Sequence, residues 1–284
     1  MLAISLIAAA YLQDDHLLAG HDHLANTPRQ LMILQALAMR MPKYGHLSLI
    51  TGDDGAKLSK RHGSFSLHDL RREGYLAHAV LNYLSRLSHT YEQQKLMSFS
   101  ELANNFKLEK LSKASARFDK NQLLHWQKEA VMVLDNAATL AWIGSDIVNH
   151  VPADKLDLFA EVMRHNILFP EDAQKWANIL FGDDSKVFLA SKIDLLKEAG
   201  EPFFTTAKDA VKIHGVDLKS VCEDLKIKLN IAGKKLFMPL RIALTGEENG
   251  PELVQIAKLL GQDEMQNRFD LVLKLMRNEH AKHL

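Results

Sequence analysis

The sequence has a single cysteine, Cys222, and this scarcity excludes two kinds of site. One thiol can form no internal disulfide, and it leaves no set of cysteines to hold a structural zinc ion. We expect Cys222 to be a small buried side chain rather than a nucleophile. The lack of disulfides fits a reducing compartment, so we expect a cytoplasmic protein.

The chain also lacks an excess of charge of either sign, with 35 Lys and Arg residues against 35 Asp and Glu. No overall field draws it to nucleic acid or to an anionic membrane, so a polyanion site must be a local patch. Long apolar runs are missing too. The run at residues 1–12 is too short to cross a bilayer as a helix, and it lacks the positive start of a signal peptide. We expect a buried strand there and no contact with a membrane.

What is present is an ordinary globular composition, with 47% hydrophobic residues in a chain of 284. Near the start, Thr27 is a candidate N-cap and Pro28 suits the first helical position. The short apolar run HLSLI at residues 46–50 precedes the turn TGDDG and predicts a strand followed by a loop. This order of strand, helix, strand and glycine loop is typical of an α/β sheet.

From about residue 66 the patterns become helical. Ser98 stands three residues before Glu101, which is the spacing of a capping box. In the stretch 74–88 one helical face is predicted to carry Leu76, Val80, Tyr83, Leu84 and Leu87. Further helices are predicted over 119–134, 152–166, 170–181 and 263–276. The three tryptophans are expected in the core: Trp126, Trp142 and Trp176.

The stretch GDDGAKLSKRHG, residues 52–63, places Lys57, Lys60 and Arg61 between glycines. Glycines let a backbone approach a ligand closely, and lysine point charges suit phosphate. The stretch does not have the Walker pattern of phosphate loops. By charge density alone it could equally be a solvated surface turn.

The same string resembles a known motif. Lys-Leu-Ser-Lys-Arg at residues 57–61 is similar to the second signature of class I aminoacyl-tRNA synthetases, in the variant typical of glutamyl-tRNA synthetases. The resemblance is colinear to the carboxyl terminus. It includes the strings GHDHLANTPRQ, HLSLITGDDGAKLSKRHG, GYLAHAVLNYLSRL, SARFDKNQLLHW and GKKLFMPLRIALTG.

The resemblance implies a mostly α fold. It consists of a short α/β remnant of a class I synthetase catalytic domain, followed by helical stem-contact and anticodon-binding domains. The parts it implies are the end of the catalytic domain at 1–65, a stem-contact region at 66–136, and two anticodon-binding helical subdomains at 137–184 and 185–284.

The resemblance also implies the chemistry of a glutamate–tRNA ligase. ATP, accompanied by Mg²⁺, would activate L-glutamate as glutamyl-adenylate, and glutamate would then pass to tRNA(Glu); tRNA(Gln) stays open as a second substrate. Lys60 would stabilise the phosphates as charge builds in the transition state. The cation Lys57 is the second catalytic candidate, and Ser59 and Arg61 would complete the ATP-phosphate contacts. We expect a monomer.

A cluster of histidines allows two interpretations. His16, His21, Asp22 and His23 could be a metal site or a hydrogen-bonded group. The family has Asp-His at the positions of Asp22 and His23 without using them for zinc. The resemblance therefore implies that these two residues lie next to the substrate and that the chain holds no metal of its own.

Two groups of cations are candidates for contact with a tRNA backbone, although a solvated face is the default for such a group. The first recurs every three or four residues and would form one face if the segment were helical; it comprises Lys107, Lys110, Lys113, Arg117 and Lys120. The second surrounds Phe237, with Lys226 and Lys228 nearby, and its tRNA-contact candidates are Lys234, Lys235 and Arg241.

The sequence departs from the family pattern in two ways. It has no counterpart of the family's first half, which carries the first signature and most of the glutamate pocket. Within the matching part, Ala19 replaces an arginine that contacts the amino acid, and His21 replaces an acidic residue. We therefore expect that the chain alone does not activate glutamate. The alternatives are a non-catalytic tRNA-binding module or a fragment that works beside a partner chain, and, less in keeping with the colinear match, an unrelated phosphate-binding enzyme.

Overall fold

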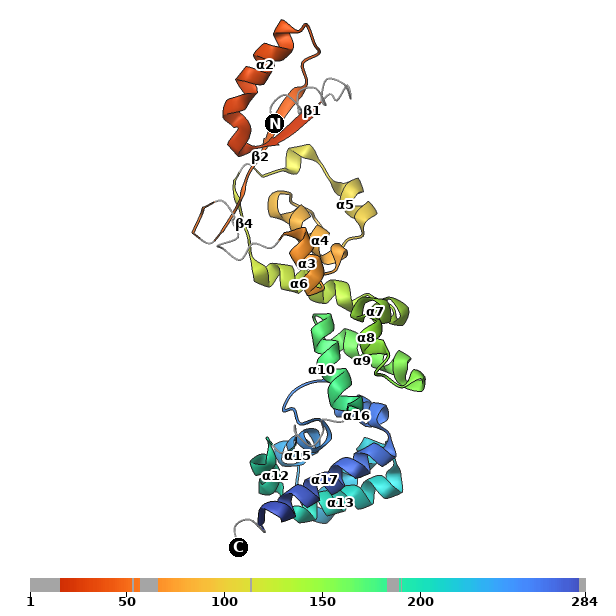
Figure 1. Ribbon diagram of the computed structural model, residues 1–284. Helices are drawn as coiled ribbons and strands as arrows, with labels where there is room; N and C mark the ends of the chain where they lie inside the picture. The colour runs from red at the N-terminus through yellow and green to blue at the C-terminus, as the bar shows by residue number, and fades with distance from the viewer. Residues whose placement is uncertain are drawn as a thin grey trace. The chain divides into compact units, whose positions relative to one another are not determined.

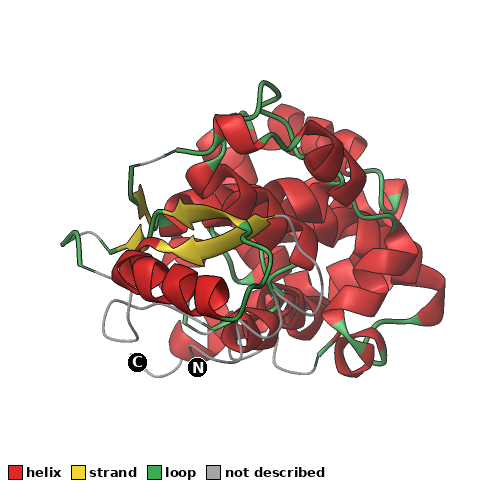
Figure 2. Cartoon of the chain, turned by 90° about the horizontal axis from the view of Figure 1, so that it is seen from above, coloured by secondary structure: helices red, strands yellow, loops and turns green. Residues whose placement is uncertain are grey.

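Figure 1 shows the computed structural model of the chain, which describes residues 16–52, 54–56, 66–112, 114–182, 189 and 191–280. The chain divides into two compact units, Met1–Ala130 and Val131–Leu284, which we call unit 1 and unit 2. Helices make up most of the described residues, and the strands form two small parallel sheets (Figure 2). The fold is therefore mostly α with a short α/β part, as the sequence predicted.

The elements of unit 1 follow the predicted order of strand, helix and strand before they become helical. They are β1 (His16–Gly20), a 3-10 helix (His21–Asn26), α2 (Thr27–Ala36), β2 (Lys43–Leu47), β3 (Ile50–Thr51), α3 (Leu67–Glu73), α4 (Ala77–Ser88), α5 (Phe99–Asn105), a second 3-10 helix (Leu108–Lys110), β4 (Ala116–Arg117) and α6 (Lys120–Met132). The last of these begins in unit 1 and ends just beyond it. The predicted strand at residues 1–12 lies outside the described residues.

Strands β1 and β2 pair in parallel, with Gly20 opposite Leu47. The 3-10 helix and α2 connect them, so this is a small strand–helix–strand unit of the α/β type. Pro28 lies in the first turn of α2, as predicted. The N-cap is Asn26 rather than Thr27, because the Thr27 hydroxyl is engaged instead with Nε2 of His46 on β2, at 2.9 Å.

Helix α4 buries the face that the sequence predicted only in part. Val80 and Tyr83 are buried as expected, whereas Leu84 is 37% exposed. Asn82, a polar residue, is completely buried in its place. The structure tolerates this because every polar atom of the Asn82 amide has a hydrogen-bond partner, as described below.

The capping box of α5 is confirmed. The Ser98 hydroxyl accepts a hydrogen bond from the backbone N–H of Glu101, and the Glu101 carboxylate accepts one from the backbone N–H of Ser98. Helix α3 has the same arrangement between Ser66 and Asp69. Each box satisfies two backbone donors that a helix start leaves free.

Unit 2 is a helical domain around one hydrophobic cluster. Its elements are α7 (Asn136–Ile143), α8 (Ser145–Val148), a 3-10 helix (Ala153–Lys155), α9 (Leu156–Asn166), α10 (Pro170–Phe181), α12 (Ile193–Ala199), α13 (Glu201–His214), α14 (Leu218–Leu229), α15 (Lys234–Thr245), α16 (Leu253–Leu260) and α17 (Gln262–His280). Cys222 and Trp176 are buried members of this cluster, and Trp142 is half-buried against it. Trp126 is buried in unit 1. The predicted core positions of Cys222 and of the tryptophans are therefore confirmed.

A buried cation ties three helices of unit 2 together. Arg268 on α17 is only 3% exposed, and its guanidinium donates to the backbone carbonyls of Ile179 and Leu180 at the end of α10 and of Leu244 on α15. Its Nε also donates to Glu264 at 2.8 Å. A buried charge is tolerable only when it is paired and hydrogen-bonded in this way.

Among the described residues, no helix combines the length and the apolar character that crossing a bilayer requires.

Candidate functional site

The glycine-rich stretch begins at the end of a strand. β3 pairs in parallel with β4, which sets Thr51 opposite Arg117. After Thr51 the backbone turns tightly: Gly55 has a positive φ of 75°, and its N–H donates to the carbonyl of Gly52 at 3.0 Å. The Asp54 carboxylate accepts from the N–H of Ala56 and holds the turn. The turn therefore directs the chain out of the strand at a defined point, immediately before the lysine-rich segment.

The predicted phosphate-contact residues lie outside the described residues: Lys57, Ser59, Lys60 and Arg61. The structure describes both flanks, the turn at 54–56 and the capping box that begins α3 at Ser66.

The pairing of β3 with β4 brings one predicted tRNA-contact residue to this place. Arg117 is exposed on β4, opposite the last residue of β3. Nothing in the local sequence indicates this pairing, because the two strands are far apart along the chain and each is only two residues long.

The predicted substrate-adjacent residues Asp22 and His23 lie in the 3-10 helix after β1. Gly20 leaves room for the Asp22 carboxylate, because a Cβ atom at Gly20 would lie 2.6 Å from the Asp22 Oδ1. The side chain of His23 contacts the Asn26 amide through Nδ1 at 3.4 Å. In the part of the chain that the structure describes, no three His, Cys, Asp or Glu side chains form a group that could hold a metal ion.

The first group of predicted tRNA contacts does not form one helical face. Lys107 precedes a 3-10 helix that ends at Lys110, Arg117 is in β4, and Lys120 begins α6; Lys113 lies outside the described residues. The condition on which these cations would share one face, a helix over the whole segment, is thus not met. Strand pairing of β4 with β3 and a turn at Ser112, whose hydroxyl accepts from the N–H of Ala114, interrupt any helix here.

Within the first group of predicted tRNA contacts, some cations form ion pairs with described carboxylates of the protein and others do not. Lys110 forms an ion pair with Glu92 at 2.9 Å, and this pair lowers the pKa of the Glu92 carboxyl. Arg117 has no ion pair with any described residue. An exposed pair contributes little to stability, and it also reduces the charge available to a polyanion.

The second group lies on two neighbouring helices of unit 2. On α14, Lys226 pairs with Glu223 at 2.6 Å and Lys228 pairs with Asp224 at 3.2 Å. On α15, Lys234 and Lys235 occupy the first turn. A helix carries partial positive charge at its amino end, so two lysines there oppose the helix dipole. Glu248, whose carboxyl has its pKa lowered mainly by its ion pair with Lys192, also attracts Lys234.

Helix α15 contributes lining residues to two cavities. One, of about 470 Å³, is lined by Cys222, Phe237 and Arg241 among others, and the other, of about 700 Å³, by Lys234, Lys235 and Met238 among others. Arg241 donates to the carbonyl of Pro251 at 2.9 Å, and burial lowers its pKa. Burial raises the pKa of the Cys222 thiol, which fits a core side chain better than a nucleophile.

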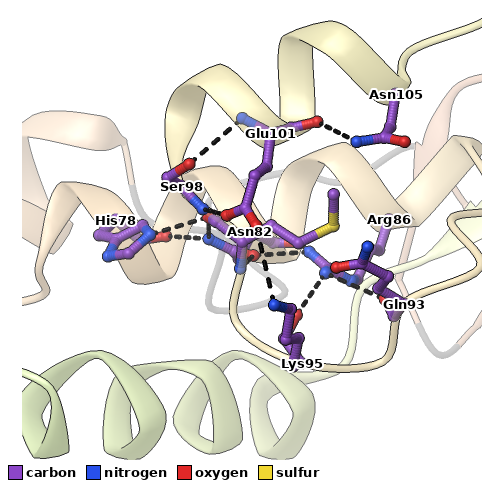
Figure 3. Close-up of polar contacts among 9 residues, drawn as sticks. His78, Asn82, Arg86, Gln93, Lys95, Ser98, Glu101 and Asn105 are labelled. Atoms are coloured by element: carbon purple, nitrogen blue, oxygen red, sulfur yellow. Dashed lines mark hydrogen bonds and ion pairs between the residues drawn. The ribbon is translucent and has the colours of Figure 1, made fainter.

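The most elaborate polar network of unit 1 was not predicted from the sequence (Figure 3). Asn82 donates to the carbonyls of His78 and Met97, and its oxygen accepts from the N–H of Met97 and from Arg86. Arg86 in turn donates to the carbonyl of Lys95 at 2.8 Å. The network fixes the loop between α4 and α5, so it positions backbone rather than presenting groups to a ligand.

The guanidinium of Arg86 also stacks on an aromatic ring. Its central carbon lies 4.2 Å from the centre of the Trp126 ring and 5.4 Å from that of Tyr91. These residues line a cavity of about 490 Å³. Because both Nη atoms of Arg86 already donate to unit 1, the guanidinium is a structural group here.

Comparison with known protein families shows which class of protein has these two regions. Residues 11–125 match the family described as tRNA synthetases class I (E and Q), catalytic domain, and residues 145–273 match the family described as anticodon binding domain. The two matches follow one another along the chain, in the order that a class I tRNA synthetase with a helical anticodon-binding region requires.

Within the class I tRNA synthetases, curated proteins similar to this chain are named glutamate–tRNA ligase. Glutamate–tRNA ligase 1 of Coxiella burnetii (strain CbuG_Q212) is 47% identical over 254 residues, which are 89% of this chain and 54% of the relative. Glutamate–tRNA ligase 1 of Halorhodospira halophila (strain DSM 244 / SL1) is 40% identical over 265 residues, 93% of this chain and 55% of the relative. The chain thus has the catalytic-domain and anticodon-binding regions of a class I tRNA synthetase, it is similar over these regions to proteins named glutamate–tRNA ligase, and it spans about half the length of these curated relatives.

Solved structures agree on the fold. Crystal structures of a glutamate tRNA ligase from Elizabethkingia meningosepticum CCUG26117, in complex with its amino acid, and of glutamate-tRNA synthetase from Elizabethkingia anophelis match with TM-scores of 0.77 and 0.80. Each is 22% identical and covers 96% and 97% of this chain, respectively, and 59% of its own.

Proposed function

We propose that this chain supplies the phosphate-binding loop and the tRNA-binding helical region of a glutamate–tRNA ligase. The observation that carries the proposal is the 47% identity, over 254 residues, to a relative named glutamate–tRNA ligase. The reaction is the ATP-dependent activation of L-glutamate, with Mg²⁺ accompanying the ATP, and transfer to tRNA(Glu). The active unit includes further polypeptide, because the chain spans about half the length of its relatives.

In this proposal Lys60 and Lys57 stabilise the ATP phosphates, with Ser59 and Arg61 beside them. A cation held at the leaving pyrophosphate stabilises the transition state more than the ground state. Asp22 and His23 lie next to the substrate. The four parts are the catalytic remnant at 1–65, the stem-contact region at 66–136, and two anticodon-binding subdomains at 137–184 and 185–284.

The tRNA contacts proposed are Lys107, Lys110, Lys113, Arg117, Lys120, Lys234, Lys235 and Arg241. Two features support this assignment. Arg117 is exposed near the start of the phosphate loop. Lys234 and Lys235 sit at the positive end of α15, where the helix dipole disfavours a cation, and Lys235 forms no ion pair with any described residue. Such contacts fix the position of a backbone rather than read sequence.

The first experiment measures ATP–pyrophosphate exchange by the chain alone, with glutamate and tRNA present. We expect no exchange above background, because half of the relatives' length has no counterpart here. The full-length Coxiella relative serves as the positive control. Turnover by the chain within tenfold of that control would contradict the proposal that it needs further polypeptide.

The second experiment measures binding of fluorescent tRNA(Glu) to the chain at 50 and 200 mM salt, with tRNA(Gln) as a parallel arm. Backbone contacts release counterions, so we expect the affinity to fall at least tenfold between the two salt concentrations. Absence of binding at low salt would refute the tRNA-binding part of the proposal. Binding without any gain of exchange activity when the remainder of a relative is added favours a non-catalytic tRNA-binding module instead.

The phosphate role of Lys60 can be tested on the chain itself with inorganic pyrophosphate as the probe. We expect Lys60→Ala to weaken pyrophosphate binding at least fivefold. Lys95→Ala, which removes an exposed cation paired with Glu101, is the matched control and should leave binding unchanged. Equal affinity of wild type and Lys60→Ala would remove the proposed role.

A further inference from the structure

The lining of one cavity in unit 1 contains a cation and no carboxylate. This cavity, of about 490 Å³, is lined by residues of α4, of the loop that follows α4, and of α6. Arg86, His89 and His125 belong to the lining, and none of its members, all of which lie in the described part of the chain, is acidic. A recess lined by charge of one sign attracts ions of the opposite sign. The cavity is therefore suited to an anion.

Arg86 brings to this cavity a positive charge and one unused donor. Its Nη1 donates to the backbone carbonyl and to the side-chain oxygen of Asn82, and its Nη2 donates to the carbonyls of Gln93 and Lys95 (Figure 3). These acceptors are all uncharged, so they orient the guanidinium without neutralising it. The remaining donor, Nε, is buried and has no hydrogen-bond partner among the described residues.

A second unused donor is on His89, whose side chain lies in the same lining and is 5% exposed. Its Nε2 accepts from the backbone N–H of Lys107 at 3.0 Å, so the neutral ring carries its proton on Nδ1. This Nδ1 is also buried and without a hydrogen-bond partner among the described residues. The ring is held in place between Tyr91 and Phe106, with 4.3 and 5.1 Å between ring centres. Buried donors are seldom left unpaired, so two of them at one cavity indicate a ligand with acceptor oxygens.

The exposed part of the lining adds uncharged donors, which are the amides of Gln94 and Gln122 and the hydroxyl of Thr90. Together with Arg86 and His89 they make a set that is rich in donors. A phosphate group has three terminal oxygens and a charge near −2, so it can accept from more of these donors than a carboxylate can. We propose that this cavity binds the phosphate group of a small molecule. The site goes beyond the proposed function and does not depend on it.

The burial of the two unused donors favours a small molecule over the phosphates of tRNA. Nε of Arg86 and Nδ1 of His89 are buried, whereas Gln122 and His125 are exposed on the same lining. A ligand therefore reaches the buried donors only by passing these exposed side chains. A phosphate within an RNA helix is fixed between two sugars on a wide surface and cannot enter in this way, whereas a small anion can.

The first experiment titrates the intact chain, labelled with ¹⁵N-histidine, with inorganic phosphate at constant ionic strength and pH 7.5. Two-bond ¹H–¹⁵N spectra report both nitrogens of each ring, and His89→Gln assigns the signals of His89. We expect the Nδ1 signal of His89 to shift saturably with a Kd of about 1 mM or tighter, and the signals of His150 in unit 2 to stay unchanged. An unchanged His89 signal at about 20 mM phosphate, well above that Kd, would overturn the proposal.

Two neighbouring substitutions on α6 separate binding in the cavity from a general change of charge. Gln122→Glu places a carboxylate in the lining, and Asn121→Glu places the same charge one residue away and outside the lining, both at exposed positions. We expect Gln122→Glu to weaken phosphate binding about tenfold and Asn121→Glu to weaken it less than about twofold. Circular dichroism spectra equal to wild type check that both variants are folded. Equal effects of the two substitutions would contradict binding in this cavity.

A final experiment identifies the source of the phosphate and separates this site from the phosphate role proposed for Lys60. Lys60→Ala should keep the His89 response to phosphate within twofold of wild type, and loss of that response would overturn a site separate from the segment 57–61. Equilibrium dialysis of radiolabelled phosphate against the Lys60→Ala chain then tests for competition by tRNA(Glu). We expect saturating tRNA to leave phosphate binding within twofold. Displacement of the phosphate by tRNA would assign the cavity to the tRNA backbone and overturn the small-molecule ligand.

Discussion

Asn82 organises a loop that has almost no regular structure of its own. Its amide is fully buried and makes hydrogen bonds to His78, to both backbone polar groups of Met97, and to Arg86. The connection from α4 to α5 is thereby closed by one side chain. A polar group buried this completely stabilises a fold only because all its bonds are satisfied.

Replacing this amide should therefore be costly. We expect Asn82→Ala to destabilise unit 1 by about 2–4 kcal/mol, because it leaves the N–H of Met97 buried without a partner and the C=O of Met97 with His78 alone. The measurement is hydrogen exchange followed by mass spectrometry on the intact chain, read from peptides of α4. Asn105→Ala removes one exposed bond to the carbonyl of Glu101 and should change stability by less than about 0.5 kcal/mol. Equal effects of the two substitutions would contradict the role given to Asn82.

The buried ring of His89 predicts that the stability of unit 1 depends on pH. Its ring is 5% exposed, and its Nε2 accepts from the backbone N–H of Lys107 at 3.0 Å. Burial, together with the charge of Lys110, lowers its pKa from the usual value. His89 therefore binds a proton at a higher pH in the unfolded chain than in the folded one. Its contribution to stability is fully present above the unfolded pKa and is lost as the pH falls from the unfolded pKa through the folded pKa.

We expect exchange in peptides covering 89–107 to report falling stability between pH 7.5 and pH 5.5. His89→Gln, which has an acceptor for the Lys107 N–H and no proton to gain, should flatten the dependence in this window. His125→Gln, at an exposed ring, is the control and should keep the slope of wild type. The carboxyl groups of Glu92 and Glu101, whose pKa values are lowered by their hydrogen bonds, lose their contribution only at lower pH. A slope that His89→Gln leaves unchanged would show that His89 is not its source.

At the scale of elements, Gly250 marks the place where the loop after α15 passes over a core tryptophan. Its φ is +144°, and a Cβ atom there would lie 2.3 Å from the Trp176 ring. Gly250→Ala should destabilise unit 2 by about 2–5 kcal/mol through strain and overpacking. Gly144→Ala, at a positive φ of 94° with open space around it, should cost about 1–3 kcal/mol from strain alone. Exchange in unit 2 peptides measures both, and a smaller effect at Gly250 than at Gly144 would contradict the packing argument.

Helices whose ends are set by residues close in sequence could be predicted from the sequence, whereas strands that form only by pairing with a distant segment could not. The helix predicted at 170–181 is α10 with the same bounds, because Pro170 fixes its first residue. The capping box at Ser98 was equally local. Strands β3 and β4 depend on each other across the chain, so the sequence could not decide whether the cations between 107 and 120 share a helical face, and in the structure they do not.

In the candidate site, too, the features that are contiguous in sequence could be predicted and those that depend on distant contacts could not. The segment 57–61 was recognisable because its motif is contiguous in sequence. The position of Arg117 opposite Thr51 depends on strand pairing, and the Asn82 network depends on a helix and a distant loop, so neither had a local signal. Polar residues within an amphipathic helix are usually exposed, and this default concealed the burial of Asn82.

At the scale of the whole molecule, a net charge of zero means that polyanion binding depends on which cations are free. Lys226 and Lys228 are held in ion pairs on α14. Lys235 on α15 has no ion pair with any described residue, and it stands where the helix dipole disfavours a cation. Unit 2 therefore offers two pairs of lysines for comparison: both lysines of the α14 pair are held in ion pairs, whereas Lys235 of the α15 pair is not.

We expect Lys234→Ala/Lys235→Ala to weaken binding of tRNA(Glu) about tenfold at 100 mM salt, and to reduce the slope of log affinity against log salt by about 1–2. Lys226→Ala/Lys228→Ala removes the same formal charge but also leaves Glu223 without its lysine and Asp224 with His214 as its remaining partner. If those lysines do not contact tRNA, their loss should leave the salt slope unchanged and lower the affinity less than threefold, through the unscreened carboxylates. Fluorescence anisotropy over 50–300 mM salt measures both quantities. A larger fall in slope for the α14 variant than for the α15 variant would transfer the proposed contact from α15 to α14.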